Sequence, residues 1–136
     1  MRRFASAIAL SLVCAACSSS SGSDADKGDP PVAKDFALSP TNVAVGKAQV
    51  LMGNITLEDA DGDLSVLYNQ VRPPDGSTQP ISESSLSALA NKKAATVPMQ
   101  LSMPALPAAG DYVVSVWAKD KAGNESPKVT ITITAK

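Results

Sequence analysis

Residues 111–136, DYVVSVWAKDKAGNESPKVTITITAK, contain two segments in which apolar residues recur at every second position. Successive side chains of a β-strand point to opposite faces of a sheet, so this period indicates strands with one buried face. The polar stretch KAGNES between them is typical of a turn. We therefore predict a hairpin with one Thr-rich face and one apolar face, the latter formed by Tyr112, Val114, Val116, Ala118, Val129, Ile131 and Ile133.

The same alternation begins at Val32 and is interrupted about every eight to twelve residues by Pro, Gly, Asp or Asn. This spacing is typical of an all-β sandwich. We expect further strands in three segments and a first strand that is broken at Pro40; the three segments are 48–59, 63–71 and 96–103.

Three local features of these segments lead to more detailed expectations. Pro98 cannot donate a backbone hydrogen bond, which places its strand at an edge or a bulge. Segment 82–95 has leucines at helical spacing and is expected to form a short helix or a loose edge strand. In 63–71, alternation predicts that Leu64, Val66 and Tyr68 share one face.

Length and composition limit the class of protein. The 136 residues suffice for one domain, and 44% hydrophobic with 18% charged residues indicates a globular chain. A net charge of −1, with scattered Lys and Arg, argues against nucleic acid as a partner. There is no histidine, and the two cysteines are Cys14 and Cys17. The folded part therefore has no histidine base or ligand, no cysteine nucleophile and no disulfide.

The first residues have the pattern of a signal peptide. Arg2 and Arg3 precede an apolar run of about ten residues, which is short for a membrane span of roughly 20. Small residues then precede Cys17, and this arrangement resembles the bacterial lipobox, in which the cysteine after the cleavage site becomes lipidated. Cys14 stands where that family usually has Leu. The alternative is ordinary secretion with cleavage near the same position.

The resemblance implies three regions: a signal peptide in 1–16, lipidated Cys17 with a flexible Ser/Gly/Asp tether in 17–31, and a folded domain in 32–136. Two or more acyl chains on the cysteine would give a stable membrane anchor. The residue after the cysteine is Ser18 and not the Asp that retains such proteins in the inner membrane, which favours the outer membrane or the cell surface. Removing the signal leaves 10 of the 12 basic residues against 13 acidic ones, a net charge of −3.

The motif LPAAGDYVVSVWAKDKAGNES (106–126) resembles the end of bacterial Ig-like domains and is similar to PKD-type and fibronectin type III-like modules. EDADGDL (58–64) likewise resembles the turn between strands B and C of that superfamily. The resemblance covers 32–136 and implies an Ig-like antiparallel β-sandwich of about seven strands. It also implies that Tyr112 forms a tyrosine corner, whose hydroxyl bonds to the backbone just upstream.

Acidic residues in two predicted loops are candidate ligands for a metal ion. An EF-hand is excluded because Leu64 stands where that loop needs Gly. In an Ig-like sandwich the B–C and F–G loops share one end, so calcium remains possible between them, with Asp59, Asp61, Asp63, Asp120 and Asn124 as ligands. The alternative, which we favour, is that Asp-Gly and Gly-Asn simply form turns.

Trp117 is the one large residue expected on the outward face of its strand. It would either contact a ligand, as exposed aromatics do, or be covered by segment 82–95; we favour the covered state. Exposed loop carboxylates without a cleft do not indicate catalysis, so we expect no enzyme and no required cofactor.

Two functions fit this sequence. In the first, the protein is an envelope- or surface-anchored lipoprotein whose Ig-like domain binds a protein or glycan, for example in adhesion. In the second, it is a structural or accessory lipoprotein that packs against a larger cell-envelope complex. Ig-like folds host both roles, and the fold does not choose between them.

Overall fold

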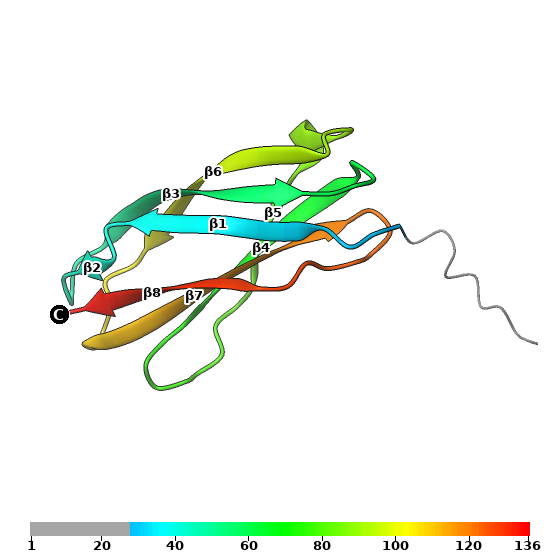
Figure 1. The fold of residues 1–136 in the computed structure, drawn as a ribbon. Coiled ribbons are helices and arrows are strands. Elements are labelled where there is room, and N and C mark those ends of the chain that lie inside the picture. The colour runs from blue at the N-terminus through cyan, green and yellow to red at the C-terminus, as the bar shows by residue number, and fades with distance from the viewer. Residues whose placement is uncertain (1–27) are drawn as a thin grey trace, which may run out of the picture.

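The computed structural model describes residues 28–136, which form eight β-strands and one short 3₁₀ helix (Figure 1). The predicted signal peptide, Cys17 and most of the predicted tether lie outside the described residues. Within 28–136, no helix is long and apolar enough to cross a membrane. In chain order the elements are β1 (Val32–Ser39), β2 (Asn42–Val43), β3 (Gln49–Glu58), β4 (Leu64–Arg72), β5 (Ser82–Ser85), η1 (Ser87–Leu89), β6 (Ala94–Met103), β7 (Gly110–Asp120) and β8 (Val129–Ala135).

The strands form two facing sheets. One has the order β1-β3-β6 and the other β2-β8-β7-β4-β5. All neighbouring strands are antiparallel except β2 and β8, which are parallel. The predicted Ig-like antiparallel β-sandwich is confirmed, with eight strands in the described chain where about seven were expected.

The predicted break at Pro40 is confirmed, and it joins the two sheets. Before the break β1 pairs with β3, and after it β2 pairs with β8 in the opposite sheet. The alternatives for segment 82–95 are both realised, because β5 is a short edge strand and η1 is a single helical turn. Pro98 lies in β6, which is an edge strand as predicted.

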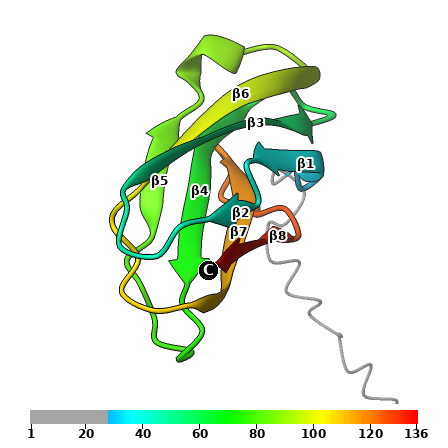
Figure 2. The same ribbon diagram turned by 90° about the vertical axis from the view of Figure 1, so that its left-hand side faces the viewer.

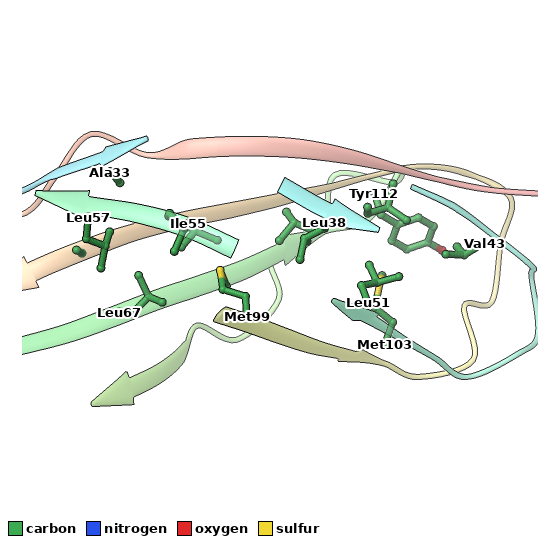
Figure 3. Packing of buried hydrophobic residues seen from close by; sticks show 14 of the residues in the cluster. Ala33, Leu38, Val43, Leu51, Ile55, Leu57, Leu67, Met99, Met103 and Tyr112 are labelled. Carbon is green, nitrogen blue, oxygen red and sulfur yellow. The ribbon is translucent and has the colours of Figure 1, made fainter. Parts of the chain in front are cut away.

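The core lies between the sheets and consists mainly of inward-facing residues of the strands other than β5 (Figure 3). Leu51, Ile55 and Leu57 of β3 are fully buried, as are Val114 and Val116 of β7. These are the residues that the alternation placed on the apolar faces. Two sheets with apolar inner faces stabilise each other because packing removes both faces from water.

Tyr112 lies at the far end of this core, and its hydroxyl donates a hydrogen bond to the carbonyl of Ala108 at 3.0 Å. The ring is buried, while the hydroxyl reaches the backbone four residues upstream. This is the contact expected of a tyrosine corner, and it ties the connection before β7 to the strand itself.

The predicted face of Leu64, Val66 and Tyr68 is wrong. Leu64 pairs with Asp120 and Val66 with Lys119, so β4 holds one extra residue, Ser65, between these pairs. This bulge changes the phase of the alternation. Leu64 therefore faces the core together with the later residues Leu67 and Val71, while Tyr68 faces outward opposite Trp117.

Truncating a buried β3 side chain should destabilise the domain much more than truncating its exposed neighbour. Ile55→Ala leaves a cavity in a fully buried site, and we expect a loss of about 2–5 kcal/mol in the free energy of unfolding. Met52→Ala, on the outer face and 56% exposed, should cost no more than about 0.5 kcal/mol. Guanidinium unfolding measures both, and equal effects would contradict the assigned faces of β3.

Candidate functional site

The loops that follow β3 and β7 meet at one end of the sandwich. Because β4 and β7 are antiparallel neighbours, the start of one lies beside the end of the other (Figure 1). Leu64 pairs with Asp120, and the amide of Lys121 donates to the carbonyl of Asp63 at 3.0 Å. The expected meeting of the two loops is confirmed, and it brings Asp63 and Asp120 into the same region.

Asp59 holds its own loop in shape. Its side chain is buried (1% exposed) and accepts hydrogen bonds from the amides of Asp61 at 3.0 Å and Asp63 at 3.1 Å. The amide of Asp59 donates to the carbonyl of Lys93 at 2.8 Å, which attaches the loop to the segment before β6. Gly62 adopts a φ of +72°, which glycine tolerates without a steric penalty. The carboxylate of Asp59 thus stabilises the turn through these hydrogen bonds.

Asp120 and Asp61 also accept backbone hydrogen bonds, at separate positions. The two carboxylate oxygens of Asp120 accept from the amide and the side-chain nitrogen of Asn124, both at 2.7 Å. Asp61 is exposed and accepts from the amide of Asp29 at 2.8 Å. No group of three or more His, Cys, Asp or Glu side chains in 28–136 is arranged to hold a metal ion. Calcium binding here stays a prediction.

The surroundings of Asp63 disfavour the ionised form of its carboxyl. Burial raises the pKa of its carboxyl, and so do a hydrogen bond with Asp59 and the negative charges of Asp120, Asp59 and Asp61. Its Oδ1 atom is buried without a hydrogen-bond partner among the described residues. The ionised form of Asp63 therefore destabilises the folded loop relative to the unfolded chain.

Asp63→Asn should stabilise the protein at pH 7. A carboxyl whose pKa is raised by folding binds its proton more tightly in the folded state, so wild-type stability falls as pH rises from about 3.9 through the folded pKa. The neutral amide removes this loss and still offers a hydrogen bond to Asp59. Urea unfolding at pH 3 and pH 7 should show a gain for the variant at pH 7 only.

The matched control is Asp75→Asn. The amide and hydroxyl of Ser77 lower the pKa of Asp75, so its ionised form is favoured in the folded state. This control should change stability in the opposite direction at pH 7. A destabilised Asp63→Asn protein at pH 7 would contradict the assigned charge repulsion.

Trp117 lies on the outer face of β7, as predicted, but it is only 4% exposed. Its ring stacks on Tyr68 with 5.3 Å between centroids, and Nζ of Lys128 lies 4.1 Å from the ring centroid. The exposed-contact hypothesis for Trp117 is therefore wrong, because these two side chains cover the ring. The covered state that the sequence favoured is confirmed, but the contacts come from Tyr68 and Lys128 and not from segment 82–95. The bulge at Ser65 places Tyr68 on this face.

A groove at the opposite end of the sandwich is a feature that the sequence did not predict. It has a volume of about 520 Å³ and lies between the β4–β5 connection and the β6–β7 connection. Its wall contains apolar side chains, hydroxyls, amides and one carboxylate, that of Asp75. Its lining includes Val71, Asp75, Leu101, Ser102, Met103 and Leu106. They come from separate segments, and no local motif marks them.

Comparison with known proteins identifies the fold and no family. No family model matches the chain, and no curated protein matches it. Among solved structures it is similar to the PKD domain of an M14-like peptidase from a Thermoplasmatales archaeon, with 23% identity and a TM-score of 0.50, covering 79% of this chain and 97% of that one. It is also similar to fibronectin(III)-like modules from Clostridium thermocellum, with 17% identity and a TM-score of 0.48, covering 79% of this chain and 47% of that one. The likeness to the PKD domain supports the Ig-like sandwich and extends to the fold alone.

Proposed function

We propose that this chain is a bacterial envelope lipoprotein, anchored through Cys17, whose Ig-like sandwich is a non-enzymatic binding module. The lipobox-like residues before Cys17 and the Ser/Gly/Asp segment after it support the anchor. The Ig-like fold, which commonly serves as a binding or accessory module, supports the role of the domain. Ser18 supports a location in the outer membrane or at the cell surface.

The observation that carries this proposal is the placement of the groove relative to the start of the domain. β1 begins beside the end of β3, and the amide of Asp29 contacts Asp61, so the chain enters at the end that holds the loops after β3 and β7. The groove is lined by residues at the other end of the sandwich, beside the start of β7. β8 also ends there, because Ala135 pairs with Gly110; Figures 1 and 2 show this end of the ribbon by the label C. A domain anchored through residues that precede Gly28 would present this groove away from the membrane.

The accessory role is the second candidate, and one surface favours it. Val50 and Met52 of β3 are about half exposed on the outer face of the three-stranded sheet. Their cross-strand neighbours on β6 are Ser102 and Gln100, so the part of the face around Val50 and Met52 is uncharged. Such a surface fits packing against a larger envelope complex. In a pull-down from detergent-solubilised envelope, replacing Val50 and Met52 with Ser would abolish capture by this face and leave capture by the groove unchanged.

Cys17→Ser should abolish the lipid anchor. Without the thiol no acyl chain can be attached, so the variant should incorporate no labelled fatty acid and should leave the membrane fraction. Cys14→Ser is the matched control and should behave like the wild type, because Val13 precedes Cys14 where a small residue is expected. Labelling in cells followed by fractionation measures both properties. A Cys17→Ser protein that is still labelled and membrane-bound would refute the lipoprotein proposal.

The calcium hypothesis gives a separate prediction. A site filled at 100 times its Kd raises the free energy of unfolding by about 2.7 kcal/mol, so thermal unfolding should shift upward with calcium and downward with chelator. Asp61→Asn combined with Asp120→Asn should erase the shift. A wild-type protein with no response to calcium would leave these loops as hydrogen-bonded turns.

A further inference from the structure

The sandwich is joined along one side and open along the other. On the first side, β1 and β2 pass from one sheet to the other. On the second side, β5 and β6 are edge strands of different sheets and do not pair. The chain between them crosses near the loop after β3, where Asn91 donates to Gly62 and Asp59 donates to Lys93, both at 2.8 Å. The groove lies on this open side, at the end away from that crossing.

The edge of β6 beside the groove offers unpaired backbone groups. Pro98 has no N–H, yet it pairs with Asn54 without a break in register. The side of the backbone that would carry the N–H and that carries the C=O of Pro98 therefore faces away from β3. Residues two apart in a strand direct their N–H and C=O groups to the same side. The backbone groups of Gln100 and Ser102 therefore also face the open side, and no strand in 28–136 pairs with that edge.

The side chains around this edge combine an apolar floor with one negative charge. Leu101 and Met103 of β6 lie in the wall together with Val71 and Leu106. The only charged side chain in the lining is Asp75, and its hydrogen bonds from Ser77 favour the ionised carboxylate. A complementary ligand would supply apolar groups, backbone-like donors and acceptors, and a positive charge.

The segment that precedes the domain does not fit this description. Residues 18–31 contain no large apolar residue. Their described part, 28–31, lies at the opposite end, about 33 Å away along the ten residues of β3. A sugar would find no stacking surface, because the only aromatic residue in the lining is Tyr112, which is 3% exposed. The free edge of β6 beside an apolar floor and one carboxylate instead fits an extended segment of another protein.

We propose that the groove binds an extended segment of a partner protein, which adds a strand to β6 along Gln100–Ser102. Alternate apolar side chains of this segment pack on Leu101 and Met103, and a Lys or Arg lies beside Asp75. In strand addition of this kind, main-chain hydrogen bonds provide affinity and side-chain pockets provide specificity. This inference rests on the proposed binding function and specifies the partner of the same module.

The test uses the lipid-anchored full chain in detergent and a displayed library of random nine-residue peptides as the probe. Selection should enrich peptides with alternating apolar residues and one Lys or Arg. Binding of an enriched, fluorescently labelled peptide should weaken at least 10-fold in Ser102→Pro, which removes one N–H from the free edge. Ser102→Ala keeps that N–H and should bind like the wild type. Asp75→Asn should weaken binding about 3- to 10-fold at low salt, and less at high salt.

Two further measurements guard against a folding artefact. The unfolding midpoint of Ser102→Pro should match that of Ser102→Ala, because a proline already lies on the same edge at position 98. A peptide with N-methyl groups on the amides that face β6 should lose binding to the wild-type protein, and this result does not depend on any variant. Failure to enrich peptides, or equal binding by Ser102→Pro and Ser102→Ala, would overturn the proposal.

Capture of envelope proteins separates this inference from the function on which it rests. A partner that the wild type and Ser102→Pro capture equally would leave the binding module standing and exclude the edge of β6 as its surface. Failure of the wild type to retain either an envelope protein or a peptide would contradict both. Self-association that Ser102→Pro abolishes, with no peptide enriched, would assign the edge to a second copy and overturn the partner-segment proposal.

Discussion

Burial of alternating apolar side chains between the two sheets is the constraint that fixes the rest of the domain. Both cysteines lie near the start of the chain, so no disulfide joins the sheets. The two sheets are held together instead by apolar packing, in which Leu51, Ile55 and Val114 are fully buried. A shift of one residue in any strand would turn its apolar set toward water, so this burial also fixes the register of each strand. The loops are then placed by the strands that they connect.

This placement brings the acidic side chains of the loops after β3 and β7 close together, which is electrostatically unfavourable. Because Leu64 must face the core beside Asp120, Asp63 is held close to three other carboxylates. The loop compensates by using Asp59 and Asp120 as acceptors for its own backbone amides and for Asn124. These hydrogen bonds satisfy groups that a tight turn would otherwise leave unpaired. The carboxylates of Asp59 and Asp120 therefore stabilise the conformation of these loops.

The sequence predicted those parts of the fold in which the period of two is uninterrupted. The faces of 48–59 and 111–120 follow directly from alternation, and the resemblance supplied the topology that brings their loops together. The face predicted for 63–71 is wrong because alternation assumes that each residue pairs with one residue of the neighbouring strand. Ser65 is an extra residue between the pairs of Leu64 and Val66. The spacing of three between Leu64 and Leu67 is the signal that was available for this bulge.

The functional residues were harder to predict, since their surroundings depend on contacts between distant segments. The cover of Trp117 by Tyr68 follows from the same bulge and was missed for the same reason. The groove is formed by residues on β4, β6 and two connections, and its composition resembles ordinary surface until these segments are brought together. Pro98 is the one residue whose type indicates part of this site, because a proline is typical of an edge strand such as β6.

The two sides of the sandwich differ, because β1 and β2 join the sheets along one side and the other side leaves the edge of β6 unpaired within 28–136. Backbone amide hydrogen exchange tests this difference residue by residue. The account predicts slow exchange for the amides of Ile55 and Val116, which lie in central strands, and fast exchange for those of Gln100 and Ser102. Slow exchange at Gln100 and Ser102 in the absence of any partner would show that the edge is already paired and would contradict the account.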